Sequence, residues 1–88
     1  MSSEDTGQDI AVIPKNSREQ IRISLSEFMD FRLVNIRVFT DDGAQWIPTK
    51  KGLSIRVERL RDLQEALRKA EYASVRAGLL SEIQEATQ

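Results

Sequence analysis

Basic, polar and aromatic side chains recur at every second position in two stretches of this sequence, residues 21–28 and 32–40. Alternate side chains of an extended strand point to opposite faces, so this spacing predicts two neighbouring strands with one polar and one apolar face. Guanidinium groups on such a face can bind phosphate, and exposed rings can stack on unpaired bases. The expected members of the polar face are Arg22, Ser24, Ser26, Asn35, Arg37 and Phe39.

Further aromatic and basic residues lie close to these stretches. Phe28 ends the first stretch, Trp46 has the same parity as Lys50, and Lys50 and Lys51 precede Gly52 in an expected turn. A lysine pair beside a glycine can clamp a phosphate, but it is also common in solvated turns. Charged residues on a strand also protect edges and aid solubility, and each aromatic residue could belong to a small core. The pattern alone leaves both interpretations open.

The composition narrows the possible chemistry. The chain has 88 residues and contains no cysteine and no histidine, which argues against zinc sites, thiol nucleophiles and imidazole bases. We therefore expect no catalytic set, no metal and no cofactor. Residues 1–14 carry a net charge of −3, residues 15–56 carry eight bases and five acids, and residues 57–88 carry five bases and six acids. The expected sheet is therefore basic although the whole chain carries −1.

The alternation and a later change of period predict an α+β fold, with four antiparallel strands followed by one long amphipathic helix over residues 58–77. Residues 1–16 are expected to form a flexible acidic tail, although the apolar patch at 10–13 could add an edge strand or contact a partner. Residues 17–77 form the expected domain, and residues 78–88 form an extension after a helix stop at Gly78. The expected strands are Gln20–Phe28, Arg32–Thr40, Gln45–Lys50 and Leu53–Arg56, with turns at 29–31, 41–43 and 51–52.

The expected helix carries one apolar stripe. A domain of about sixty residues without disulfides or zinc has a marginal core, so a second chain is the remaining means of stabilisation. We therefore expect a homodimer. Its expected interface residues are Val57, Leu60, Leu63 and Leu67.

Three runs in register resemble the positive cofactor four family of transcriptional coactivators, whose bacterial and phage members are small single-stranded DNA-binding proteins. They are residues 23–28 (ISLSEF), residues 34–37 (VNIR) and residues 48–55 (PTKKGLSI), the last passing directly into the expected helix. The order, spacing and layout agree from about Arg18 to Leu67. The resemblance implies a strongly curved sheet and a dimer that pairs through its helices. Antiparallel stretches of single-stranded DNA would run along the strand surfaces.

The resemblance also implies roles for individual residues. Phe28 matches a base-stacking aromatic residue, Arg37 matches a phosphate-binding arginine, and Lys50 and Lys51 match the basic turn. The sequence departs from the family where residues 29–31 replace a basic loop and where Thr40, Ile47 and Thr49 replace the usual residues. Arg32 and Trp46 would compensate in part. The full expected DNA-binding set is Arg18, Arg22, Phe28, Arg32, Asn35, Arg37, Phe39, Trp46, Lys50 and Lys51.

The leading hypothesis is a homodimeric, non-enzymatic protein that holds single-stranded DNA with little sequence preference in transcription, replication or repair. A protein-interaction module that acts as a transcription cofactor, with polymerase or replication proteins as partners, is the alternative. RNA binding on the same face is a third possibility. The sequence contains neither an apolar run of membrane-spanning length nor a signal-peptide pattern, so we expect a cytoplasmic, nucleoid-associated protein without membrane contact.

Overall fold

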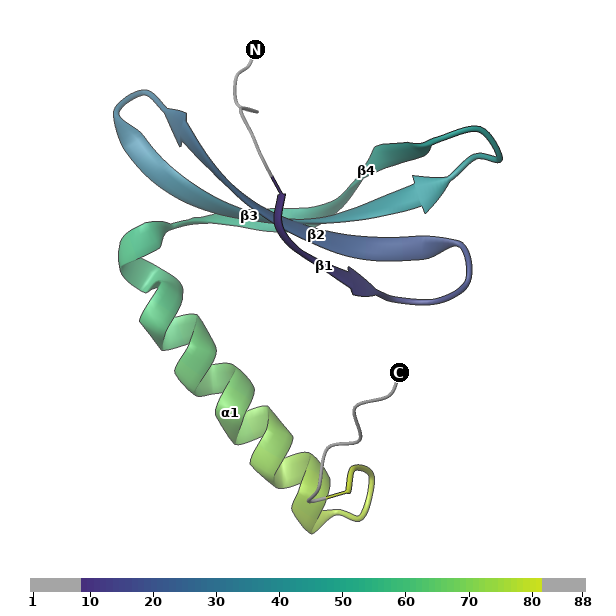
Figure 1. The fold of residues 1–88 in the computed structure, drawn as a ribbon. Helices are drawn as coiled ribbons and strands as arrows, with labels where there is room; N and C mark the ends of the chain where they lie inside the picture. The colour runs from purple at the N-terminus through teal and green to yellow at the C-terminus, as the bar shows by residue number, and fades with distance from the viewer. Residues whose placement is uncertain (1–8, 82–88) are drawn as a thin grey trace. The chain divides into compact units, whose positions relative to one another are not determined.

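The computed structural model describes residues 9–81, which belong to two compact units that divide between Glu58 and Arg59. The first unit is a four-stranded antiparallel sheet whose strands neighbour one another in chain order (Figure 1). The second unit contains one helix. This arrangement confirms the expected fold class. The elements are β1 (Asp9–Pro14), β2 (Glu19–Phe28), β3 (Phe31–Asp41), β4 (Trp46–Arg56), a 3₁₀ turn (Val57–Arg59) and α1 (Leu60–Arg76).

The register of β2 against β3 gives the sheet its two faces. Ile21, Ile23 and Leu25 lie opposite Val38, Ile36 and Val34, and these six residues define the apolar face. The alternate positions define the polar face, as the sequence predicted. Polar-face pairs across the two strands are Arg22 with Arg37, Ser24 with Asn35, Ser26 with Leu33 and Gln20 with Phe39.

The expected third and fourth strands are one continuous strand, β4, so the prediction of a turn at residues 51–52 was wrong. The register of β4 against β3 shifts between Arg37 and Phe39, and β4 accommodates extra residues there. Gly52 has a φ of +141°, and a Cβ at this position would lie 2.2 Å from the carbonyl oxygen of Ile36. Gly52 is therefore needed for a close approach of two strands and does not form a chain reversal.

The remaining strand comes from residues that the sequence assigned to the tail. Asp9–Pro14 form β1, which pairs with β2 at the edge of the sheet. The apolar patch thus takes the edge-strand option, because alternate residues of β1 continue the two faces of β2. Residues 1–8 of the expected tail and residues 82–88 of the expected extension lie outside the described residues.

Two hairpins connect the central strands. Met29 and Asp30 have φ values of +51° and +73°, as a two-residue turn between twisted strands requires. At the β3–β4 hairpin, Asp42 Oδ1 accepts hydrogen bonds from the backbone N–H groups of Ala44 and Gln45, both at 2.9 Å. These two bonds lower the pKa of Asp42, and the bond from Ala44 has the larger effect. The aspartate pair at 41–42 therefore belongs to the turn, as the sequence indicated.

The helix α1 has one apolar stripe and a defined end. Gly78, with a φ of +77°, donates from its N–H to Val75 O at 3.0 Å, and the Leu79 N–H donates to Ser74 O at 2.9 Å. This pair of bonds is a Schellman motif, which ends a helix at a glycine as predicted. Among residues 9–81, no helix is long and apolar enough to cross a membrane.

The described residues have very little interior. Val34, 2% exposed, is the one buried apolar side chain among them. Leu25 and Leu53, both on the apolar face, remain 49% and 48% exposed, and no residue of α1 is buried. Exposed apolar side chains of this kind are typical of surfaces that contact other protein surfaces.

Candidate nucleic-acid interface

The polar face holds two arginine residues directly opposite each other. Arg22 on β2 and Arg37 on β3 are Cα partners in the ladder. Like charges at directly opposite positions destabilise a sheet unless an anion lies close to them. Both residues line a groove of about 650 Å³ that runs over the polar face. The groove is lined by Asp9, Arg22, Ser24, Ser26, Glu27, Phe28, Leu33, Asn35, Arg37, Phe39 and Pro48.

Arg22 is held in place by three groups. Its Nε donates to Gln20 Oε1 at 2.7 Å, and its Nη1 lies 3.3 Å from Asp9 Oδ2 on β1. Its guanidinium carbon lies 4.3 Å from the centre of the Phe39 ring, within the range of a cation–π contact. The side chain is 22% exposed, so the charge is ordered and remains accessible.

Arg37 is bound differently. Its Nη1 donates to the carbonyl oxygen of Thr49 at 3.1 Å, in the segment where β4 shifts register. The irregularity of β4 therefore positions the guanidinium of Arg37. No carboxylate among the described residues lies within ion-pair distance of Arg37, and its charge remains available to an anion.

A row of polar groups crosses the groove between strands β2, β3 and β4. Asn35 Nδ2 donates to Ser26 Oγ at 2.9 Å and lies 3.5 Å from Ser24 Oγ. Ser54 Oγ donates to Asn35 Oδ1 at 2.6 Å. The expected Asn35 is thus the centre of a hydrogen-bonded row, whose hydroxyl groups can also bond to a ligand in the groove.

The expected aromatic residues lie at the two ends of this face. Phe28 lines the groove at the β2–β3 end and is 63% exposed, while Phe39 lines it at the other end. Trp46 pairs with Asp41, which shares the parity of Phe39, so Trp46 lies near the β3–β4 hairpin beyond the groove lining. The polar face therefore combines rings with cations, as the alternation predicted.

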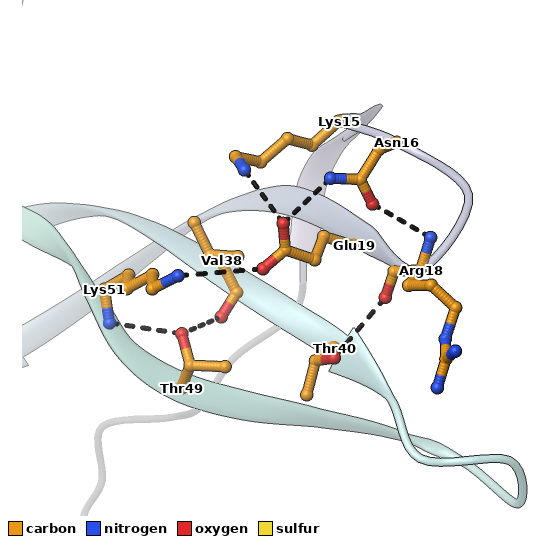
Figure 2. A network of polar contacts seen from close by, with 8 residues as sticks. All are labelled: Lys15, Asn16, Arg18, Glu19, Val38, Thr40, Thr49 and Lys51. Carbon is orange, nitrogen blue, oxygen red and sulfur yellow. Dashed lines mark hydrogen bonds and ion pairs between the residues drawn. The ribbon is translucent and has the colours of Figure 1, made fainter.

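Lys51 belongs to a different network of polar contacts, and Glu19 lies at the centre of that network (Figure 2). Glu19 accepts hydrogen bonds from Lys15 Nζ at 2.8 Å and Asn16 Nδ2 at 2.9 Å, and its second oxygen lies 3.9 Å from Lys51 Nζ. Both bonds lower the pKa of Glu19, and the bond from Lys15 has the larger effect. Because Glu19 has the parity of Ile21, Lys51 is drawn toward the apolar side of the sheet.

The other expected cations are also separated from the groove. Arg32 pairs with Glu27 in the ladder at a position that alternates with the polar face. Arg18 lies in the β1–β2 connection, where its carbonyl oxygen accepts from the Asp41 N–H at 2.9 Å. Lys50 is exposed within the irregular part of β4 and makes no ion pair with a described residue. The groove thus brings together Arg22, Phe28, Asn35, Arg37 and Phe39 of the expected set.

Two residues of the polar face were not in the expected set. Phe31 begins β3 instead of lying in a turn, and the Arg56 guanidinium carbon lies 3.9 Å from the centre of its ring. Extending the alternation of Leu33 and Asn35 by one step toward the N-terminus would have found Phe31. Arg56 has the parity of Ser54, which pairs with Asn35 of the polar face.

The described residues offer little for metal or acid–base chemistry. Within residues 9–81, no group of three or more potential metal ligands comes together. The groove instead presents cations, hydroxyl groups and rings, which suits an extended anionic ligand with flat apolar groups. A sheet face that combines cations with exposed rings is typical of small proteins that bind nucleic acid.

Comparison with known proteins gives the family. Residues 15–66 match the family model described as Transcriptional Coactivator p15 (PC4), and no curated protein matches the chain. A PC4 homologue from Burkholderia pseudomallei, in an orthorhombic crystal form, is 34% identical with a TM-score of 0.69, over 80% of this chain and 96% of that one. The same homologue in a tetragonal crystal form is 33% identical with a TM-score of 0.68, over 75% of this chain and 98% of that one.

A phage protein is also similar. The bacteriophage T5 homologue of the eukaryotic transcription coactivator PC4, implicated in recombination-dependent DNA replication, is 26% identical with a TM-score of 0.53. The similarity covers 82% of each chain. Since the family model spans more than half of this sequence, the chain belongs to the PC4 family of transcriptional coactivators.

Proposed function

We propose that this protein is a homodimeric, non-enzymatic single-stranded DNA-binding protein that holds unpaired strands in the groove of its polar face. The observation that carries the proposal is the directly opposed pair Arg22 and Arg37 in a groove lined by the rings of Phe28 and Phe39. Membership of the PC4 family supports the same function.

Phosphate capture comes first in the mechanism. A phosphate bound near Arg22 and Arg37 would offset the like charges of these two ladder partners and would accept charge-assisted hydrogen bonds. Arg22 already holds the carboxylate of Asp9 at 3.3 Å, which shows that an anion fits beside it. Binding of this kind does not depend on base sequence.

Stacking supplies the preference for unpaired strands. Phe28 exposes 63% of its surface, and a base stacked on such a ring contributes about 1–3 kcal/mol. Bases in a duplex hide their faces from a flat ring, whereas unpaired bases expose them. The serine hydroxyl groups beside Asn35 add hydrogen bonds that any base or phosphate can accept.

A second copy of the chain would cover the apolar surface. In α1, Leu60, Leu63, Leu67 and Ala70 follow one another at steps of three and four, which is the spacing of a seam between two helices. Leu67 is 59% exposed. Together with Val57, this stripe is our proposed dimer interface.

Fluorescence anisotropy over a salt series tests the binding. For single strands, the slope of log K against log salt changes by about 0.7 for each neutralised phosphate. Replacing Arg37 with Ala should weaken binding of a thymine-rich oligonucleotide and flatten that slope by about 0.7. An unchanged slope in a folded Arg37→Ala variant would contradict phosphate capture at this position.

Sedimentation equilibrium tests the assembly. The wild type should sediment as a dimer, and Leu63→Glu should shift it toward monomer because a carboxylate would be buried in the seam. Glu65→Gln, an exposed change two residues away, is the matched control and should leave the dimer intact. A monomeric wild type, or equal behaviour of both variants, would contradict the helix seam.

A further inference from the structure

The polar face has a second arginine–ring pair at the end of β3 opposite to Phe39. The Arg56 guanidinium carbon lies 3.9 Å from the centre of the Phe31 ring, closer than Arg22 lies to Phe39. Both residues belong to the sheet unit, and both have polar-face parity, because Arg56 pairs with Leu33 in the ladder. Phe31 itself pairs with Phe28 across the hairpin.

The charge of Arg56 is not used within the described part of the chain. The Arg22 side chain is bound by Asp9 and Gln20, whereas no hydrogen bond or ion pair joins the Arg56 side chain to a residue in the range 9–81. A guanidinium stacked on a ring keeps its donors at the edge of the plane, free for a phosphate. Phe31 is 44% exposed, so one side of this pair remains accessible.

The position of this pair continues the groove. Phe28 and Leu33 line the groove and are the ladder partners of Phe31 and Arg56, respectively. Phe31 and Phe39 are eight residues apart on one strand, which corresponds to about 27 Å. The serine–asparagine row lies between them. Two arginine–ring pairs therefore mark the two ends of one continuous surface.

We propose that Arg56 and Phe31 form a second nucleic-acid subsite, in which Arg56 binds a phosphate and Phe31, with Phe28 beside it, stacks a base of the same strand. The inference rests on the proposed function and deepens it by giving the groove a defined second end. It also assigns a cation to the β2–β3 end, where Arg32 lies on the opposite face.

Neighbouring arginine residues allow a matched test. Arg56→Gln removes the proposed phosphate contact, whereas Arg32→Gln removes the same charge one residue from Phe31 on the other face. With a thymine-rich oligonucleotide longer than the 27 Å path, Arg56→Gln should flatten the salt slope by about 0.7, and Arg32→Gln should leave it nearly unchanged. Arg56→Lys, which keeps the charge, should retain the slope.

The ring is tested separately. Phe31→Leu should weaken binding about five- to 150-fold without changing the salt slope, since the loss is one stacked base. Photo-crosslinking of an oligonucleotide that carries 5-iododeoxyuridine should label the peptide that contains Phe28 and Phe31 in the wild type. Circular dichroism and thermal melting verify that each variant is folded.

The outcomes separate this inference from the proposed function. If Arg37→Ala weakens binding while Arg56→Gln and Arg32→Gln leave the salt slope equally unchanged and Phe31→Leu binds as the wild type does, the second subsite is wrong and the groove proposal stands. If the wild type has no preference for single strands and Arg37→Ala changes nothing, the proposed function itself fails. A flattened slope for Arg56→Gln alone, with the crosslink at 28–31, supports the second subsite.

Discussion

The guanidinium of Arg22 lies over the ring of Phe39 at 4.3 Å, across the boundary between two strands. The two residues are diagonal neighbours in the ladder, because Arg22 pairs with Arg37 and Phe39 pairs with Gln20. Gln20 also binds Arg22 Nε at 2.7 Å, so one cross-strand unit orders the cation and the ring together. A ligand that uses both groups therefore meets a surface that is already arranged.

The first prediction concerns this ring. Phe39→Leu should weaken binding of single-stranded DNA by about 1–3 kcal/mol, because a stacked base loses its partner. The salt slope should not change, since no cation is removed. Phe39→Tyr keeps the ring and should bind nearly as well as the wild type in an anisotropy titration. Equal losses for both variants would mean that Phe39 acts through packing and not through stacking.

The second prediction concerns Asp9, whose carboxylate occupies Arg22 at 3.3 Å in the groove. This carboxylate competes with a phosphate for the same guanidinium, so Asp9→Asn should strengthen binding of single-stranded DNA several-fold. Asp62→Asn on α1 removes the same charge from a residue outside the sheet unit and is the control. The competition idea fails if both variants strengthen binding equally, because a general change in net charge would then explain the effect.

The third prediction concerns Gly52. A Cβ at this position would lie 2.2 Å from Ile36 O and 2.8 Å from Arg37 Cα, and backbone atoms cannot easily move away. Gly52→Ala should therefore lower the free energy of unfolding by about 3 kcal/mol or more. Gly43 also has a positive φ, but nothing lies within 4 Å of a Cβ added there. Gly43→Ala should therefore lower the free energy of unfolding by only about 1 kcal/mol. Urea denaturation that ranks the two variants the other way would contradict the close approach.

The fourth prediction concerns the pH dependence of stability. The bonds from Lys15 and Asn16, with Lys51 close by, lower the pKa of Glu19 below its ordinary 4.5. A lowered folded pKa contributes stability that is fully present above the unfolded value and is lost as pH falls through the folded value. As the pH falls below about 5, the free energy of unfolding of the wild type should therefore decrease more than that of Glu19→Gln. A pH-independent difference between their thermal melts would contradict this account.

The two faces of the sheet could be predicted from the sequence for a simple physical reason. A period of two assigns each side chain to a face whatever the strand partners are, and the register confirms the assignments of Arg22, Asn35, Arg37 and Phe39. The helix end at Gly78 could also be predicted, because a glycine after an apolar stripe is a local signal.

Other features depend on contacts that no local pattern encodes. Gly52 resembles a turn glycine, and only the approach of the Ile36 carbonyl makes it part of a continuous strand. Met29 and Asp30 adopt positive φ without a glycine, so the start of β3 was placed one residue late. That shift left Phe31 out of the site. Arg32 was included in the expected set although its alternation with Val34 assigns it to the apolar face. The link between Lys51 and Glu19 joins strands that are distant in sequence.

The central claim is that the groove of the polar face holds an unpaired strand. Its most direct test is anisotropy competition, in which a labelled thymine-rich oligonucleotide bound to the wild type is displaced by the unlabelled single strand or by a matched duplex. We predict that the single strand competes at much lower concentration than the duplex and that Phe28→Leu removes most of this difference, because stacking supplies the preference for unpaired bases. Equal and weak competition by both forms would contradict the claim and would favour a protein-interaction role for the family fold in this chain.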